Sequence, residues 1–151
     1  MSVSPDTAQG LIKELYLMGR AIRIALQHPE ERQLLPGGTG ILGTLEVRGP
    51  CRQVDLVEEL VIGPSALSRH VTELVSAGYI RRHSDPGDRR ASLIVVTETG
   101  RELLGRIRLS RSRRLQSALD AWTEAEAEQA RVLIQKLRNS LAAHAHRTNG
   151  R

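Results

Sequence analysis

The chain has 151 residues, the length of one ordinary domain, and carries a formal net charge of +5 at pH 7. Hydrophobic residues make up 40% of it, but aromatic residues only 2% and Phe is absent, so the core must consist of aliphatic side chains, which favours packed helices. No apolar run approaches the ~18 residues that cross a bilayer, no segment is typical of a signal peptide, and the single Cys51 excludes an intramolecular disulfide. We therefore expect a cytoplasmic protein without a membrane partner.

The basic surplus is almost entirely arginine, because only Lys13 and Lys136 of the 22 basic residues are lysine. A positive balance favours an acidic partner such as nucleic acid. An arginine-rich, alanine-rich and lysine-poor composition is also typical of some genome base compositions, so the net charge is weak support for an acidic partner. Arginine is nonetheless the side chain best suited to phosphates and base edges, through its planar fork of donors.

Residues 7–27 predict a long amphipathic helix, which Pro29 ends. Its apolar side chains recur at alternating spacings of four and three and form a narrow seam, typical of a helix that packs against a partner helix: Leu11, Leu15, Met18, Ile22 and Ala25. Residues 39–47 predict a second helix with Thr39 as its N-cap. Residues 52–61 predict a short helix that buries Val54, Val57 and either Leu60 or Val61.

Residues 62–80 contain the clearest helix of the chain. Pro64 suits its first turn, Gly78 suits its C-terminal end, and its buried stripe consists of Leu67, Val71, Leu74 and Val75. The tight Ile62-Gly63 corner joins it to the preceding helix, and the pair predicts a helix-turn-helix.

The periodicity then changes from helical to extended. Residues 79–83 and 91–96 are β-prone, and between them Asp85-Pro86-Gly87-Asp88 suits a type II turn, with Pro at the second and Gly at the third position. Residues 97–122 predict another long helix with Thr99 and Glu102 as a capping box and six arginines between 101 and 114. A second capping box, Thr123 with Glu126, opens a last helix, and we expect the tail after His144 to be disordered.

A helix-turn-helix followed directly by a hairpin has the outline of a winged helix. Its second helix has the size to enter the major groove of DNA, and a hairpin can reach an adjacent minor groove. The side chains that we expect to contact DNA from the helix are Pro64, Ser65, Ser68, Arg69, His70 and Thr72. Hydroxyls near a helix N-terminus suit phosphates or bases, and Arg69 suits a guanine edge or a phosphate.

Residues from about 52 to 101 resemble the DNA-binding part of the MarR family of bacterial transcription regulators. The resemblance is carried by VDLVEEL, by PSALSRHVTELVSAGYIRR and by DPGDRRASLIVVTETGR. The wing pattern of the family is D-x-R, five residues, then L-T. Here Asp88, Arg89 and Arg90 are followed by ASLIV, Val96 and Thr97, so that Val replaces the usual Leu.

The resemblance implies a mainly α fold with a small β-hairpin wing (α+β), in which residues 36–98 form a winged helix-turn-helix lobe. Residues 7–35 and 99–146 would be N- and C-terminal dimerisation helices of a single domain spanning 1–151. The resemblance further implies that Arg90 enters the minor groove while Asp88 holds the Arg90 guanidinium in place. We expect Arg89 to contact phosphate; Arg81 suits either a phosphate contact or a solvated strand face. The expected partners are double-stranded DNA with an inverted repeat and a second copy of the chain.

Several alternatives stay open at this level. Tyr16, Arg20, Arg23 and His28 suit either a pocket for an anionic effector or the dimer interface, so that a repressor released by a small ligand is one hypothesis. Cys51 suits a plain packing role better than a redox-sensing one. The arginines of 101–114 suit an ion-pair face better than a second DNA surface. We find no catalytic set, no metal ligands at convincing spacing and no cofactor motif, and therefore expect no enzyme. The rival hypothesis is a winged-helix module that binds protein without specific DNA binding.

Overall fold

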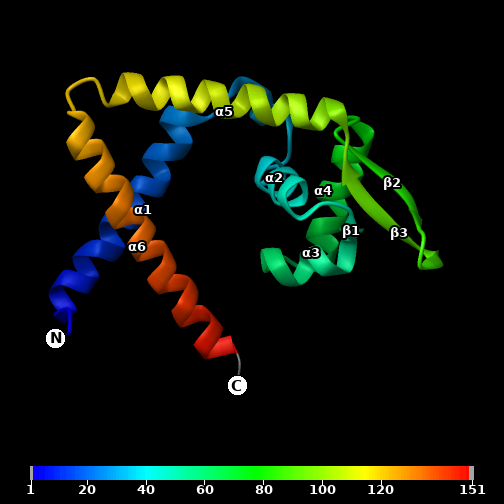
Figure 1. Ribbon diagram of the computed structural model, residues 1–151, viewed down its shortest axis with the longest axis horizontal. Helices are drawn as coiled ribbons and strands as arrows, with labels where there is room; N and C mark the ends of the chain where they lie inside the picture. The colour runs from blue at the N-terminus through cyan, green and yellow to red at the C-terminus, as the bar shows by residue number, and fades with distance from the viewer. Residues whose placement is uncertain (1, 150–151) are drawn as a thin grey trace. The chain divides into compact units, whose positions relative to one another are not determined.

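The structure is a computed structural model that describes residues 2–149 (Figure 1). In chain order its elements are α1 (Pro5–Leu26), the 3-10 helix η1 (Pro29–Gln33), α2 (Gly38–Arg48), β1 (Cys51–Arg52), α3 (Gln53–Leu60), α4 (Pro64–Ser76), β2 (Ile80–Asp85), β3 (Asp88–Val96), α5 (Glu98–Ala118) and α6 (Glu124–Asn149). This confirms the predicted fold class, mainly helical with a small β wing. The chain divides into two compact units, one up to Arg114 and one from Leu115 on, and the single-domain organisation stays a prediction.

The core of the first unit lies between α2, α3, α4, the sheet and the first half of α5. Leu42, Leu56, Leu67, Ile94 and Leu103 are fully buried there. Helix α4 contributes Leu67, Val71 and Leu74, as its periodicity predicted. Aliphatic packing therefore holds the helix-turn-helix to the sheet and leaves the opposite face of α4 free for solvent.

The sheet has three antiparallel strands in the order β1-β3-β2. The hairpin of β2 and β3 was predicted, and β1, a two-residue strand that pairs Cys51 with Ile94 and Arg52 with Leu93, was not. The predicted type II turn is wrong, because Gly87 keeps a φ outside the left-handed region that this turn requires. Instead, a side-chain oxygen of Asp85 accepts a hydrogen bond from the Gly87 backbone N–H at 2.9 Å.

Two details of the α2–α3 region differ from prediction. Helix α2 begins at Gly38 after a left-handed Gly37 (φ 95°), so Thr39 is inside the helix and not its N-cap. Helix α3 buries Leu56 completely, with Val57 and Leu60 at the edge of the core, whereas Val54 is 62% exposed. Val61, 91% exposed, is the left-handed C-cap residue of α3 (φ 51°), which turns it out of the helical face on which it was expected.

Helix α5 is capped two residues earlier than predicted. The hydroxyl of Thr97, and not that of Thr99, accepts a hydrogen bond from the Gly100 backbone N–H at 3.1 Å. The same hydroxyl donates to the Gly78 carbonyl at 2.6 Å and so joins the helix start to the end of α4. Gly100 is required at this approach, because a Cβ there would lie 2.4 Å from the Tyr79 carbonyl oxygen. The helix ends at Ala118, short of Trp122.

Arg106, Arg108 and Arg111 of α5 pair with carboxylates, as an ion-pair face predicts. Arg106 binds Glu30 at 2.9 Å, Arg111 binds Glu31, and Arg108 binds Glu46, so that η1 and α2 are both tied to α5. The hydrogen bond from Arg106 holds the pKa of Glu30 below its ordinary value. These side chains are engaged within the first unit and are not arranged as a second DNA surface.

Helix α1 begins at Pro5, capped by Ser4, and none of its residues is buried. In the second unit, the capping box of Thr123 and Glu126 is confirmed: the Glu126 backbone N–H donates to the Thr123 hydroxyl at 3.3 Å, and Thr123 N–H donates to the Glu126 carboxylate at 2.8 Å. Helix α6 continues to Asn149, so the expected disorder after His144 is wrong for residues 145–149. None of the described helices combines the length and apolarity that a bilayer crossing requires.

Candidate DNA interface

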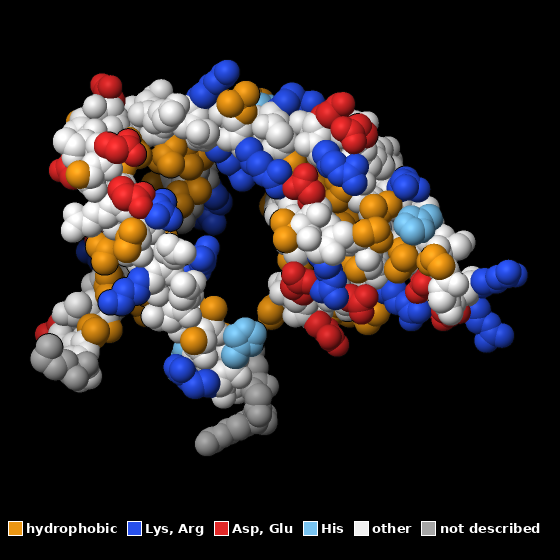
Figure 2. All heavy atoms as spheres, viewed as in Figure 1, with side chains coloured by type: hydrophobic (Ala, Val, Ile, Leu, Met, Phe, Trp, Pro, Cys, Tyr) orange, Lys and Arg blue, Asp and Glu red, His pale blue; other side chains and the backbone are white. Residues whose placement is uncertain are grey.

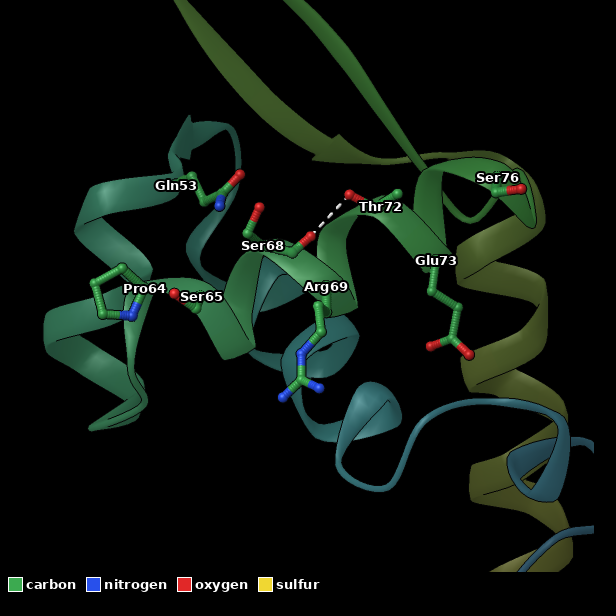
Figure 3. Close-up of a pocket in the computed structure, with 8 residues that line it drawn as sticks. All are labelled: Gln53, Pro64, Ser65, Ser68, Arg69, Thr72, Glu73 and Ser76. Atoms are coloured by element: carbon green, nitrogen blue, oxygen red, sulfur yellow. Dashed lines mark hydrogen bonds between the residues drawn. The ribbon is translucent and has the colours of Figure 1, made fainter.

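A shallow groove follows the solvent face of α4 (Figure 3). Its lining includes five of the six side chains predicted for this helix: Pro64, Ser65, Ser68, Arg69 and Thr72. The Arg69 side chain extends away from the helix, and the Thr72 hydroxyl donates to the Ser68 carbonyl at 2.9 Å. The groove therefore presents hydroxyls and one guanidinium on a helix whose other face is held in the core, the arrangement that base-edge and phosphate contacts require.

Three lining residues of this groove were not predicted: Gln53, Glu73 and Ser76. Both carboxylate oxygens of Glu73 lie within hydrogen-bonding distance of the Leu35 backbone N–H, at 2.8 and 3.0 Å, so Glu73 ties α4 to the loop before α2. An acidic residue on the polar face of a DNA-facing helix is a signal for such a structural contact, because it would repel phosphates. Gln53 lies at the first position of α3 and gave no comparable signal.

His70 is not on the groove. Its Nδ1 is buried and has no hydrogen-bond partner among residues 2–149, and a Cβ built on Gly38 would lie 3.8 Å from that atom. The ring therefore packs beside the start of α2. Its position in the helix, one residue after Arg69, rotates it from the exposed face toward the flank, so the structure does not bring it to the expected DNA face.

The wing carries the exposed side chains of Arg81, Arg89 and Arg90, and Figure 2 shows basic side chains that project at its tip. Asp88 has different partners from those predicted. One of its oxygens accepts a hydrogen bond from the Arg90 backbone N–H at 3.0 Å, and the other lies 3.8 Å from Nη2 of Arg52. Within residues 2–149, no acceptor is paired with the Arg90 guanidinium, so that Asp88 orients the backbone of Arg90 and not its side chain.

Arg52 is a residue of this region that the sequence did not single out. Its Nε and Nη2 donate to Oδ2 of Asp85 at 3.0 and 2.8 Å. This hydrogen-bonded pair holds the pKa of Asp85 below its usual value and raises the pKa of Arg52. No local pattern could have shown the contact, because Arg52 and Asp85 are far apart in the chain and meet only through the pairing of β1 with β3.

A separate hollow in the first unit is lined by α1, η1, the start of α2 and α5. Its lining combines apolar Ile22, Leu26 and Leu35 with the charged Arg23, Glu31 and Arg111. Of the four residues predicted for an effector pocket, Arg23 alone is in this lining. Tyr16 is 79% exposed, Arg20 is also exposed, and His28 caps η1 by accepting the Glu30 N–H on Nδ1 at 3.2 Å.

The remaining chemically reactive groups form no second centre. Cys51 is buried in the core beside β3, and burial raises the pKa of its thiol, which favours the unreactive form. Within the described chain, no group of three or more His, Cys, Asp or Glu side chains could hold a metal ion.

A helix-turn-helix packed on a three-stranded sheet, with an arginine-tipped hairpin beside the exposed helix, defines the class of winged-helix proteins. Comparison with known proteins narrows this class. A sequence model of the MarR family matches residues 39–91. The HTH-type transcriptional regulator YxaD of Bacillus subtilis (strain 168) is 34% identical over 97 residues, which cover 64% of this chain and 68% of YxaD. YdgJ of the same organism, also named an HTH-type transcriptional regulator, is 32% identical over 92 residues, 59% of this chain and 54% of YdgJ.

Solved structures of the family share the fold over nearly their whole length. Apo wild-type MarR from E. coli matches 91% of this chain and 98% of its own, with a TM-score of 0.72 at 18% identity. YusO from Bacillus subtilis matches 91% and 99%, with a TM-score of 0.69 at 23% identity. The chain belongs to the MarR family of transcription regulators, whose winged helix binds DNA, and it is therefore a regulator and not an enzyme.

Proposed function

We propose that the protein is a sequence-specific repressor that binds an inverted repeat in double-stranded DNA as a homodimer. The observation that carries this proposal is the groove on α4, where Ser65, Ser68, Arg69 and Thr72 lie on one exposed face. We assign base reading in the major groove to this face and minor-groove insertion to Arg90. Arg81 and Arg89 contact phosphates, and Pro64 places the helix start against the backbone.

Support for the homodimer comes from apolar side chains of α1 and α6 that residues 2–149 leave exposed. On α1, Leu11, Met18 and Ile22 are between 38% and 47% exposed, and on α6, Leu133, Ile134 and Leu141 are between 52% and 58% exposed. Exposed apolar residues at helical spacing are costly unless another helix covers them. A two-fold dimer would place its two recognition helices on half-sites about 10 bp apart.

Release by a small ligand is part of the proposal. The hollow beside α1 pairs an apolar wall with Arg23 and Arg111, a combination that suits a small amphipathic anion. Arg111 is paired with Glu31 in the same lining, so an anion would compete with Glu31 for this guanidinium. Tyr16, Arg20 and His28 are outside the lining, and we assign them no part in ligand binding.

The salt dependence of DNA binding tests the regulator against the rival, a winged helix that binds only protein. A labelled random-sequence DNA duplex can be used in this titration, because phosphate contacts drive non-specific as well as specific DNA binding. The logarithm of the association constant should fall by about 0.9 per log unit of salt for each phosphate neutralised. Arg89→Ala should reduce that slope by about two in a dimer, one for each wing. Binding that is absent or independent of salt would favour the protein-binding module.

A further inference from the structure

Arg52 holds both acidic residues at the base of the wing tip. Its guanidinium donates twice to Oδ2 of Asp85, at 3.0 and 2.8 Å, and Nη2 lies 3.8 Å from Oδ2 of Asp88. The Asp85 side chain is only 16% exposed, so this contact is more sheltered than an ordinary surface pair. Both N–H groups donate to the same carboxylate oxygen, so Arg52 holds Asp85 through two charge-assisted hydrogen bonds.

The two carboxylates in turn hold the backbone of the turn. Oδ1 of Asp85 accepts the Gly87 N–H at 2.9 Å, and Oδ1 of Asp88 accepts the Arg90 N–H at 3.0 Å. Arg52 itself is anchored on the other side, because its backbone N–H donates to the Asp55 carboxylate at the start of α3, at 3.1 Å. A continuous chain of contacts therefore links the first helix of the helix-turn-helix to the backbone of Arg90.

The charge balance of the tip also depends on Arg52. Asp85 and Asp88 flank the turn and lie within a few residues of Arg89 and Arg90 in sequence. Without Arg52, a side-chain oxygen of Asp88 would be available to a neighbouring arginine, and two uncompensated carboxylates would face the phosphates of bound DNA. Arg52 thus leaves the arginines of the tip unpaired while it offsets the acidic charge beside them.

We propose that Arg52 is a positioning residue of the wing, which sets the placement of Arg90 on DNA without contacting DNA itself. The inference rests on the proposed DNA binding and adds a residue to it. It concerns geometry more than stability, because the Arg52 side chain is 44% exposed and an ion pair with one exposed partner contributes little to folding.

Asp85→Asn provides the sharpest test, because a pure charge effect and a positioning role predict opposite changes in DNA affinity. If only charge mattered, removal of a carboxylate near the phosphates would strengthen DNA binding. If Arg52 positions the wing through Asp85, affinity for the selected operator should fall, on the order of tenfold for coupled residues in contact. Glu58→Gln is the matched control, since it removes one exposed carboxylate from α3 and no contact with the wing. Tighter binding by Asp85→Asn, equal to that of the control, would overturn the proposal.

A double-mutant cycle separates positioning from direct contact. Arg52→Met should weaken operator binding by about tenfold in the wild-type background and by less than about twofold in Arg90→Ala, because it acts through Arg90. Additive losses would mean that Arg52 contacts DNA independently. Arg48→Met serves as the control arginine: it is paired with Glu59, away from the wing.

Hydrogen exchange in the DNA-free protein keeps the inference testable apart from DNA binding. The Gly87 and Arg90 amides should lose protection in Arg52→Met, whereas the amides of the α4 core should not. Unchanged protection at both wing amides would overturn the positioning role even where wild-type binding is intact. Failure of wild-type protein to bind any duplex, with the exchange result as expected, would instead refute the proposed function alone.

Discussion

Arg69 and Arg90 are proposed to contact DNA in different ways because their surroundings differ. Arg69 projects from helix α4, whose opposite face is buried, so core packing fixes where Arg69 leaves the protein surface. Arg90 projects from the tip of a hairpin, where a side-chain oxygen of Asp88 accepts a hydrogen bond from its backbone N–H. A guanidinium on a rigid helix suits a defined base edge, and one on a narrow loop suits the negative potential of a narrow minor groove.

The two arginines should therefore give different losses of specificity. Arg69→Ala should cost about 1–3 kcal/mol of binding free energy and relax the preference for one base pair, if it reads a guanine. Arg90→Ala should weaken binding most on operators with A·T-rich flanks, because these have the narrowest minor grooves. Titrations against operator variants measure both effects. Unchanged affinity of either variant would remove that residue from the assignment, and Arg48→Ala is the control for loss of one positive charge.

Among the helices and strands, the sequence pattern predicted those whose periodicity is visible within their own segment. The stripe of Leu67, Val71 and Leu74 and the hairpin are set by periodicities of 3.6 and 2, and both were found. Strand β1 was missed because two residues have no period, and it exists only through its pairing with β3. In α3, Val54 was expected in the core, but Leu56 is the fully buried residue and Val54 is 62% exposed. Val61 leaves the buried face because it is the left-handed C-cap residue of this helix.

The candidate DNA interface also contains residues that the sequence could predict and residues that it could not. Ser65, Ser68, Arg69 and Thr72 could be predicted, because the exposed face of a helix follows from its buried one. The flank position of His70, the tie from Glu73 to Leu35 and the pairing of Arg52 with Asp85 could not. Each depends on which distant segment packs alongside, and a single sequence contains no local signal for that.

The close approach of α5 to the end of α4 should make Gly100 intolerant of any side chain. Gly100→Ala would place a Cβ 2.4 Å from the Tyr79 carbonyl oxygen and 2.8 Å from the Val96 side chain, and should destabilise the fold by about 1–3 kcal/mol. Gly105, later in the same helix, has no such neighbour, and Gly105→Ala should stabilise by about 0.5–1 kcal/mol. Urea unfolding of both variants measures the contrast. Equal effects would show that the contact at Gly100 is not a tight one.

The capping box of α6 should make its stability depend on pH in acid. The Thr123 backbone N–H, followed by its hydroxyl, lowers the pKa of Glu126 from an ordinary value of 4.5. A carboxylate with a lowered pKa contributes stability that is fully present above the ordinary pKa and is lost as the pH falls through the lowered one. The melting temperatures of wild type and Glu126→Gln should therefore differ at neutral pH and converge as the pH falls through the lowered pKa of Glu126.

Glu124→Gln, in the same first turn, is the control for this experiment, because it removes a carboxylate from the helix start without a capping bond. Thr123→Ala should also lower the stability at neutral pH, by about 0.5–2 kcal/mol, since it removes the N-cap hydroxyl of the box. A difference between wild type and Glu126→Gln that stays constant from pH 7 to pH 3 would contradict the capping role.

At the scale of the whole molecule, the described chain leaves apolar side chains uncovered on α1 and α6, and the proposed dimer is what would cover them. Arg106, Arg108 and Arg111 of α5 do not form a second DNA surface, because ion pairs tie them to η1 and α2. The exposed arginines proposed to contact DNA lie on α4 and on the wing: Arg69, Arg81, Arg89 and Arg90. Dimerisation and DNA binding are therefore assigned to different surfaces and should be separable by mutation.

Leu11→Glu should shift the dimer toward monomer, by at least about tenfold in the dissociation constant, because it would bury an unpaired carboxylate against the partner helix. Lys13→Glu is the matched control, since it introduces the same side chain outside the apolar seam of α1. Sedimentation equilibrium over a range of protein concentrations measures both. A monomeric wild-type protein, or equal dissociation constants for the two variants, would contradict the proposed interface.

We propose that this winged helix recognises a defined DNA sequence as a symmetric dimer. Selection of bound fragments from random and genomic DNA with the purified wild-type protein tests both the sequence preference and the symmetry. We expect enrichment of one inverted repeat, with half-sites about 10 bp apart and A·T-rich flanks where the wings would lie. Fragments that show no common inverted repeat after repeated rounds of selection would contradict the claim.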